Sequence, residues 1–243
     1  MKQRLDLALT VRGLVKSRSV AQELINNRKV KVDGKFVTKP AHKVTEENGI
    51  EVLEQPKYVS RAGLKLETAL AEFKIAVTGL NVLDAGASTG GFTDVLLQNG
   101  AKKVWAIDVG HDQLDPKLRN DDRVVVFEGY NIRDLVLDDI GQQVDLIVGD
   151  LSFISLILVL EPLTKVLKSG HEMVLLIKPQ FEVGKERLAH TGVVTSHEQR
   201  QEAISKVLVT AQKLGLEKVS LTESPIKGSS GNVEYLVQLH KNG

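Results

Sequence analysis

NVLDAGASTGGF, residues 81–92 of the chain, is the stretch that decides the fold. It starts with a short apolar run over residues 81–84, continues through a turn with three glycines and enters the helix-length segment 92–99. A strand, a glycine-rich turn and a helix in this order are typical of parallel sheets, in which the turn lets the backbone approach a ligand closely. We therefore expect a ligand site directly after this strand.

The segments on both sides repeat the alternation of strand and helix. Apolar residues recur at helical spacing over residues 64–73, and residues 197–214 form a second long helical segment. Such alternation predicts an α/β domain with a mostly parallel sheet covered on both faces, whose ligands sit at the carboxyl ends of the strands. The predicted strands are residues 81–84, 103–108, 123–127, 145–149, 172–177, 217–223 and 234–239.

The glycine-rich turn is compatible with three kinds of site. A dinucleotide-binding turn needs the pattern G-x-G-x-x-G, and Ser88 at the middle position weakens that interpretation. Residues 86–90 also match the G-x-S-x-G turn, which would make Ser88 a hydrolase nucleophile that needs a histidine later in the chain. The candidate histidines are His190, His197 and His240.

The third kind of site is the cofactor turn of Rossmann-like methyltransferases, in which the backbone passes close under the methionine part of S-adenosylmethionine. This site also requires an acid at the end of the second strand. Asp108 ends that strand twenty-two residues after Gly86, and its carboxylate can accept hydrogen bonds from both ribose hydroxyls. A dinucleotide site needs the same acid, so Asp108 supports nucleoside binding without choosing between the cofactors.

Charged residues mark the ends of the later strands. Asp150 and Lys178 follow the fourth and fifth predicted strands, so two opposite charges should face one cleft. Glu234 opens the last predicted strand, and Lys65 lies on the first helix of this domain.

The first 59 residues differ in charge from the rest of the chain. They hold 12 Lys/Arg and 7 Asp/Glu, a net charge of +5, whereas residues 60–243 hold 20 and 24, a net charge of −4. A basic segment on a nearly neutral protein indicates a polyanionic partner, because contacts to phosphates release counterions.

This basic segment predicts a small α+β unit. Residues 4–9 and 17–25 have the spacing of two short helices, and residues 29–37 place valines on both sides of an Asp-Gly turn, which is typical of a hairpin. The alternating run 50–53 completes a small sheet. A linker is expected at residues 56–60, because Pro56 disfavours helix in the residue before it.

The composition excludes several classes of protein. The chain has no cysteine, which rules out disulfides, thiolate catalysis and cysteine zinc sites. Its hydrophobic fraction of 42% and charged fraction of 26% are typical of folded, water-soluble proteins. No segment has the pattern of a signal peptide or a membrane span, so we expect a cytoplasmic protein.

Parts of the first segment resemble the αL RNA-binding motif, first described in ribosomal small-subunit protein four. The resemblance rests on residues 4–6, 17–19, 30–34 and Pro40. It implies that two helices and a hairpin place basic side chains on structured RNA, which is recognised mainly by shape and backbone. The expected RNA-facing residues are Arg4, Arg12, Lys16, Arg18, Arg28, Lys29 and Lys31.

The chain as a whole resembles the TlyA-type branch of the FtsJ-like ribose methyltransferases. The matching segments are YVSRAGLKL (58–66), DAGASTGGF (84–92), DLSFISL (150–156), KPQFE (178–182) and GNVEYL (231–236). Lys65, Asp150, Lys178 and Glu234 fall on the lysine, aspartate, lysine and glutamate of that family. The resemblance implies 2′-O-methylation of cytidines in ribosomal RNA, and some members are also called haemolysins.

The resemblance also implies S-adenosylmethionine as the cofactor and no metal. The cofactor would lie along the glycine-rich turn and the neighbouring strand ends. The expected cofactor-binding residues are Asp84, Gly86, Ser88, Gly90, Gly91, Phe92, Asp108, Asn131 and Asp150.

The four charged residues suit methyl transfer to a hydroxyl. The sulfonium methyl is already activated, so the enzyme mainly aligns oxygen, methyl and sulfur, which is worth roughly 7–11 kcal/mol. A lysine accepts the hydroxyl proton only in its neutral form, which desolvation and a second ammonium nearby would favour. We expect Lys178 to be the base, or alternatively to steer the oxygen, with Lys65 beside it and with Asp150 and Glu234 orienting both lysines.

These observations predict an α/β enzyme with an RNA-binding domain (1–55), a linker (56–60) and a Rossmann-like methyltransferase domain (61–243). The expected partners are ribosomal RNA or ribosomal subunits, and no membrane. Longer and shorter terminal forms of this branch differ in substrate range, and the few residues before Arg4 and after Leu239 lead us to expect the shorter form, which acts on the large subunit. The alternative is a non-catalytic ribosome-binding or assembly factor that keeps a methyltransferase-like platform.

Overall fold

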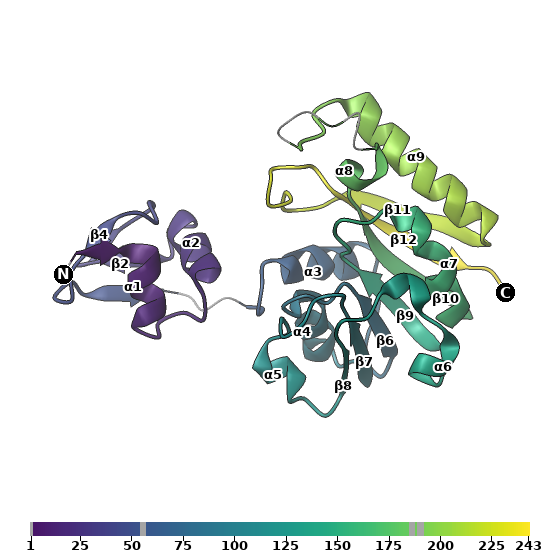
Figure 1. Cartoon of the computed structure of the whole chain (residues 1–243), viewed down its shortest axis with the longest axis horizontal. Helices are drawn as coiled ribbons and strands as arrows, with labels where there is room; N and C mark the ends of the chain where they lie inside the picture. The colour runs from purple at the N-terminus through teal and green to yellow at the C-terminus, as the bar shows by residue number, and fades with distance from the viewer. Residues whose placement is uncertain (1, 54–56, 185–187, 189–191) are drawn as a thin grey trace. The chain divides into compact units, whose positions relative to one another are not determined.

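The chain forms two compact units, Met1–Ser60 and Arg61–Gly243, in a computed structural model (Figure 1). The structure describes residues 2–53, 57–184, 188 and 192–243. Residues 54–56, where the predicted first domain ends and the linker begins, and His190 lie outside the described residues. Each unit buries a cluster of apolar side chains of its own, as expected of a folding domain.

Two helices supply most of the core of the first unit. α1 (Leu5–Val11) packs against α2 (Arg18–Asn26). The Ser17 side chain caps α2 by accepting a hydrogen bond from the Val20 N–H at 3.3 Å. The buried faces of both helices and of the hairpin share one apolar cluster.

The predicted hairpin is present, and a second small ladder was not predicted. Asp33 and Gly34 have positive φ values of 50° and 77°, which match the twist of a two-residue hairpin turn. Arg4 lies in a strand and not in the expected helix, because the chain pairs there with residues 43–44 before α1 begins. The strands are β1 (Gln3–Arg4) with β4 (Lys43–Val44), and β3 (Lys35–Phe36), β2 (Val30–Val32) and β5 (Ile50–Val52) in this order.

The second unit is built on a seven-stranded sheet in the order β11-β12-β10-β9-β6-β7-β8 (Figure 1). Neighbours from β10 to β8 run parallel, whereas β12 is antiparallel to both β10 and β11. The predicted mostly parallel sheet is therefore confirmed. The strands are β6 (Asn81–Ala85), β7 (Lys103–Ile107), β8 (Val124–Phe127), β9 (Val144–Gly149), β10 (Leu167–Ile177), β11 (Leu216–Glu223) and β12 (Tyr235–Lys241).

Five of these strands begin at residues other than the predicted ones, three of them shifted by a single residue without consequence for the site, and β10 and β12 are the two that matter here. β10 starts at Leu167 and not at Glu172, because its pairing with β9 continues across a register shift between these two residues. β12 starts at Tyr235, so Glu234 precedes the strand instead of opening it. The carbonyl of Glu234 accepts a hydrogen bond from the Ser224 N–H at 2.8 Å, which ties the entry of β12 to the end of β11.

Helices pack on this sheet and complete its core. Leu83 of β6, Leu163 of α7 and Val207 of α9 belong to one buried cluster, while α4 contacts β6 and β7 and also packs against α3. The three longer helices were predicted, and the four short ones were not. The helices are α3 (Ala62–Glu72), α4 (Gly91–Gln98), α5 (Pro116–Arg119), α6 (Leu137–Ile140), α7 (Leu160–Val166), α8 (Pro179–Glu182) and α9 (His197–Lys213).

Candidate active site

Four charged residues that are far apart in the sequence meet at the carboxyl ends of neighbouring strands. β9 and β10 are adjacent and parallel, so Asp150, directly after β9, and Lys178, directly after β10, come close together. The start of antiparallel β12 pairs with the end of β10, which brings Glu234 to the same place. Lys65 comes from α3. The structure therefore joins all four residues that were predicted to be catalytic.

Asp150 is the centre of this cluster, which we call the charged tetrad (Lys65, Asp150, Lys178 and Glu234). Lys65 Nζ lies 3.1 Å from Asp150 Oδ2 and 2.8 Å from Glu234 Oε2. Lys178 Nζ lies 2.6 Å from Asp150 Oδ1. Two ammonium groups and two carboxylates thus form a continuous series of ion pairs.

The charged tetrad is largely shielded from water. The side chains of Lys65 and Lys178 are each 8% exposed, Glu234 is 3% exposed and Asp150 is 14% exposed. Burial alone would raise the pKa of Asp150, but the charges of Lys178 and Lys65 outweigh this effect, and the pKa ends below its usual value. Asp150 therefore stays ionised and fixes the positions of both ammonium groups.

Two further residues of the site were not predicted. Lys178 Nζ donates to Ser152 Oγ at 2.7 Å, and Gln180 Nε2 donates to Glu234 Oε1 at 3.2 Å. Each stands two residues after a member of the tetrad, within the segments DLSFISL and KPQFE. That spacing was the signal that could have identified them.

An exposed aromatic side chain follows Ser152 in the loop after β9. Phe153 is 93% exposed and has a positive φ of 64°, which is a strained conformation for a bulky residue. Its ring centroid lies 5.5 Å from that of Phe181, and Lys178 Nζ lies 5.9 Å from the Phe181 centroid. The loop thus carries both a hydrogen-bond partner of Lys178 and an apolar surface open to solvent.

The predicted cofactor turn between β6 and α4 depends on its glycines. Gly86 has a φ of 82°, and a Cβ at this position would lie 3.1 Å from the carbonyl oxygen of Asp150. Gly90 has a φ of 95°, and a Cβ there would overlap the Leu118 side chain. Glycine at position 86 therefore lets the turn pass close to the strand end of β9, and glycine at position 90 lets it pack against the Leu118 side chain.

Asp108 holds the same turn in place from the end of β7. Its Oδ2 accepts a hydrogen bond from the Ser88 N–H at 2.8 Å, and its Oδ1 accepts one from the Gly110 N–H at 2.7 Å. A carboxylate oxygen has two lone pairs, so each oxygen can still accept a hydrogen bond from a ribose hydroxyl. The geometry fits a nucleoside cofactor bound across the ends of β6 and β7.

Asp84, near the end of β6, is a buried carboxylate that forms no ion pair with any of the described residues. Its Oδ2 accepts a hydrogen bond from the Thr93 hydroxyl at 2.7 Å, while its Oδ1 has no hydrogen-bond partner among the described residues. Burial raises the pKa of Asp84 to about 7, an effect that the Thr93 hydroxyl reduces and the charge of Asp150 increases. The Asp84 side chain is fully buried, so any effect that it has on the turn comes from the interior of the domain.

The other expected cofactor residues differ in accessibility. Gly91 is the first residue of α4, and the side chain of Phe92 is buried beside it. Asn131 is partly exposed and caps the short 3-10 helix over Ile132–Asp134 by accepting a hydrogen bond from the Arg133 N–H at 3.2 Å. Gly91 and Phe92 are both buried, so a contact from the Phe92 side chain to a ligand above the turn is not supported; of these three residues only Asn131 is partly exposed.

The seven basic residues expected to face RNA fall into three groups. The guanidinium groups of Arg4 and Arg18 are paired with Asp6. Arg12 donates to the carbonyls of Asn48 and Thr45, at 2.9 and 2.6 Å, and so holds a turn of its own unit. The remaining expected residues are on or near the hairpin and α2: Arg28 and Lys31 lie over the Phe36 ring, Lys16 is exposed and Lys29 is partly exposed.

The hydrolase interpretation of the turn finds no support in the described part of the chain. Ser88 Oγ donates to Gln113 at 3.2 Å and not to a histidine. His240 pairs with Glu172 near the far end of β12, away from the start of the strand that Glu234 precedes, and His197 is the first residue of α9. No group of three or more His, Asp or Glu among the described residues is arranged to hold a metal ion.

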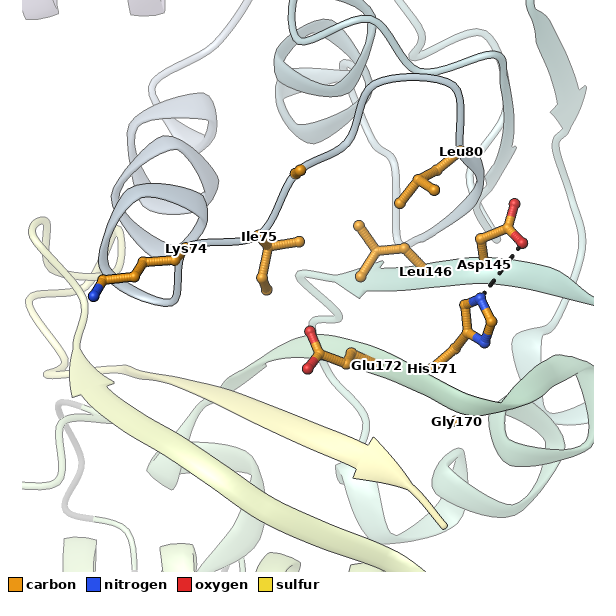
Figure 2. Close-up of a pocket in the computed structure, with 9 residues that line it drawn as sticks. Lys74, Ile75, Leu80, Asp145, Leu146, Gly170, His171 and Glu172 are labelled. Atoms are coloured by element: carbon orange, nitrogen blue, oxygen red, sulfur yellow. Dashed lines mark ion pairs between the residues drawn. The ribbon is translucent and has the colours of Figure 1, made fainter. Parts of the chain in front are cut away.

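A pocket lies at the opposite ends of the strands from the charged tetrad. Figure 2 shows it between Leu80, just before β6, and residues near the beginning of β9, with Asp145 paired to His171 at 3.7 Å. The amino-terminal part of β9 carries Asp145, whereas Asp150 follows its carboxyl end. This pocket is therefore separate from the predicted cofactor turn.

A Rossmann-like sheet with a glycine-rich turn, a strand-end acid and a buried set of four charges defines a methyltransferase domain, here joined to a small basic unit. The FtsJ-like methyltransferase family matches residues 58–241, and the S4 domain family matches residues 3–50. The chain therefore belongs to the FtsJ-like methyltransferases, in the group that contains TlyA and hemolysin A.

Similar proteins cover almost the whole chain. The 16S/23S rRNA (cytidine-2′-O)-methyltransferase TlyA of Mycobacterium tuberculosis is 48% identical over 98% of this chain and 90% of its own length. Hemolysin A of Brachyspira hyodysenteriae is 44% identical over 96% of this chain and 98% of its own. The crystal structure of a candidate hemolysin from Lactococcus lactis is 52% identical, with a TM-score of 0.76 over 78% of this chain and 91% of that one. In the described residues we find no helix with the length and hydrophobicity needed to cross a membrane.

Proposed function

We propose that the chain transfers the methyl group of S-adenosylmethionine to the ribose 2′-oxygen of cytidine in ribosomal RNA. The observation that carries the proposal is the charged tetrad, because its residues are buried, paired and placed at the strand ends next to the cofactor turn. The M. tuberculosis relative is named for this reaction on 16S and 23S rRNA.

S-adenosylmethionine would supply a methyl group that is already activated by the positively charged sulfur. The protein therefore has to bind the cofactor, orient its methyl group toward the substrate and exclude water. The fit to such a cofactor rests on the turn at Gly86, which passes close to Asp150, and on the lone pairs that Asp108 keeps for ribose hydroxyls. The residues that would hold it are Ser88, Asp108 and Asn131.

Lys178 is the residue that would act on the ribose oxygen. Its Nζ donates to Ser152 Oγ at 2.7 Å and forms an ion pair with Asp150 Oδ1 at 2.6 Å, so the ammonium keeps donor capacity for a substrate oxygen. A lysine fixed in this way can hold the 2′-oxygen in line with the methyl group, and alignment of this kind is worth roughly 7–11 kcal/mol. In its neutral form the same nitrogen would also accept the proton that the 2′-hydroxyl gives up.

Two surfaces would receive the RNA. The first unit is basic and matches the S4 domain, so it would bind phosphates. The exposed Phe153 ring beside Ser152 offers a face on which an unpaired base can stack, which is how proteins commonly hold nucleotides displaced from a helix. Because ribosomal RNA is the proposed substrate, we also propose a cytoplasmic location.

The proposal is tested by methyl transfer to purified ribosomal subunits. The protein is incubated with tritiated S-adenosylmethionine and either 30S or 50S subunits, and the RNA is digested and analysed by mass spectrometry. We expect 2′-O-methylcytidine at a defined position in at least one subunit. A methyl group on a base would contradict the ribose assignment, and binding of subunits without transfer would favour the non-catalytic assembly factor.

A further inference from the structure

A buried carboxylate in the first unit binds two of the residues expected to contact RNA. The Asp6 side chain, in the first turn of α1, is 0% exposed. Arg4 donates through Nε to Oδ1 at 2.9 Å and through Nη2 to Oδ2 at 3.0 Å, and Arg18 Nη2 donates to Oδ2 at 3.0 Å. The Leu7 N–H at 3.0 Å and Gln22 Nε2 at 2.9 Å complete the set of donors.

The Asp6 carboxylate is ionised and held by its donors on both oxygens. The hydrogen bond from Arg4 holds the pKa of Asp6 well below its usual range; burial acts in the opposite direction, and Gln22 and Arg18 add to the lowering. Five hydrogen bonds on one buried carboxylate fix its position, so the groups that it binds are fixed as well.

The two guanidinium groups remain open to solvent on their other edges. The side chains of Arg4 and Arg18 are 40% and 52% exposed. Arg4 donates to Asp6 through Nε and Nη2, and Arg18 donates to Asp6 through Nη2. The Nη1 group of each arginine has no hydrogen-bond partner among the described residues. A guanidinium group is a planar set of donors that matches the geometry of phosphate oxygens.

We propose that Asp6 is a positioning residue for RNA binding, which holds Arg4 and Arg18 in the arrangement that receives RNA phosphates while touching no RNA itself. The proposal rests on the proposed ribosomal RNA substrate. An arginine that is free to rotate loses conformational entropy when it binds a phosphate. The ion pair with Asp6 already restricts the arginine before binding, so less entropy is lost in the binding step.

The sign of the effect distinguishes positioning from simple electrostatics. A negative charge next to an RNA-binding surface repels phosphates, so its neutralisation by itself strengthens binding. Loss of arginine positioning weakens binding. Replacement of Asp6 by its neutral isostere therefore moves affinity in opposite directions under the two explanations.

The test uses the full chain and the ribosomal subunit that the wild type methylates, with affinity measured at several salt concentrations. We expect Asp6→Asn to weaken binding about tenfold, which corresponds to about 1.4 kcal/mol, because the two arginines are no longer pre-ordered. It should raise the KM for RNA and leave kcat at saturating RNA unchanged. Glu47→Gln removes an exposed acid of the same unit and should leave affinity equal or slightly higher. Unchanged or tighter binding by Asp6→Asn would overturn the inference.

A double-mutant cycle separates positioning from damage to the fold. In a chain that carries Arg4→Ala and Arg18→Ala, Asp6→Asn should have no further effect on RNA affinity, and a remaining tenfold loss would refute positioning. If Asp6→Asn alone unfolds the first unit, Arg4→Lys with Arg18→Lys keeps the charge but loses the planar donors; full affinity in that variant would overturn the inference. A wild type that binds no ribosomal RNA would contradict the proposed function instead.

Discussion

Each unit of the molecule contains a carboxylate held between two basic side chains, and the two arrangements differ in what they leave accessible. In the first unit, Asp6 is buried beneath two arginines whose side chains are 40% and 52% exposed. In the second unit, Asp150 joins two lysines that are each 8% exposed. The same pairing therefore presents charge at a surface in one case and encloses it in the other.

The choice of cation agrees with this difference. A guanidinium group keeps its charge at every physiological pH and offers several donors at once, which suits the binding of phosphates in solvent. A lysine nitrogen is a compact donor that can also exist as a neutral amine, which suits the handling of one oxygen and one proton. The exposed arginines of the first unit are thus suited to binding phosphates, and the buried lysines of the second unit are suited to handling a single oxygen and proton.

The largest expected effect comes from removing one lysine of the buried arrangement. Lys178→Ala should reduce methyl transfer by roughly 10²–10⁴-fold, because the group that aligns the 2′-oxygen or accepts its proton is gone. Affinities for the cofactor and for RNA should stay within a few-fold of the wild type. Tritium transfer to purified subunits, measured with both binding constants, tests this.

Two control variants make the Lys178 result specific. Lys178→Arg keeps a positive charge, so recovery of full activity in this variant would show that charge alone suffices and would remove the distinction between the two cations. Lys165→Ala breaks an exposed ion pair with Glu161 in the same unit, and it should change neither activity nor, beyond about 0.5 kcal/mol, stability. A loss of activity in Lys165→Ala would mean that the assay reports folding.

The second effect concerns Asp84, the buried carboxylate for which the described part of the chain provides no ion-pair partner. Its pKa is raised to about 7 in the folded protein, so the folded state binds more protons than the unfolded state between about pH 4 and pH 7. Stability from this group is present at acid pH and is lost as the pH rises through that window, by on the order of 4 kcal/mol in total.

Asp84→Asn should remove this loss, because the amide does not titrate. Urea unfolding at several pH values between 5 and 8 should show the variant gaining stability relative to the wild type as the pH rises, with no further change above about pH 7.5. A constant difference across this range would show that Asp84 is not held neutral. Asp6 and Asp150, whose pKa values are lowered, should give the opposite trend at acid pH.

A third, smaller effect is expected for cofactor binding. Asp108→Ala removes the acceptor for a ribose hydroxyl and also the one that holds the Ser88 N–H, so S-adenosylmethionine affinity should fall by about 1.5–3 kcal/mol, or roughly 10- to 150-fold. Isothermal titration calorimetry measures the change. Binding of a nicotinamide dinucleotide in place of S-adenosylmethionine would show that the turn serves a different cofactor.

The smallest effect per residue is expected for the exposed cations of the first unit. Replacement of Arg4, Arg18 and Lys31 by alanine should weaken RNA binding and reduce the slope of log affinity against log salt by about one for each phosphate that the variant no longer neutralises. Filter binding or fluorescence anisotropy at four salt concentrations gives the slope. An unchanged slope would assign these charges to the protein surface without a role in RNA binding.

The sequence predicted the sheet and the meeting of Asp150 with Lys178 from local patterns, whereas Lys65 and Glu234 were added to the charged tetrad by the resemblance to the FtsJ-like methyltransferases. Strands and long helices have a clear apolar period, and residues directly after parallel strands meet at one edge of the sheet. The pairing of β1 with β4 was missed because two-residue strands have no period to detect. The roles of Ser152, Gln180 and Asp6 depend on which atoms come within hydrogen-bond distance, and that is set by packing between distant segments.

The position of β12 between β10 and β11 has a consequence for the order in which the two activities arise during synthesis. The first unit is complete after about a quarter of the chain and can fold as soon as it emerges. Glu234 and β12, which lies between β10 and β11 in the sheet, are missing from the site on the second unit until almost all of the chain has been made. Under the proposed function, a shortened chain would therefore still bind RNA but could not methylate it, and so would compete with the intact protein for the same substrate.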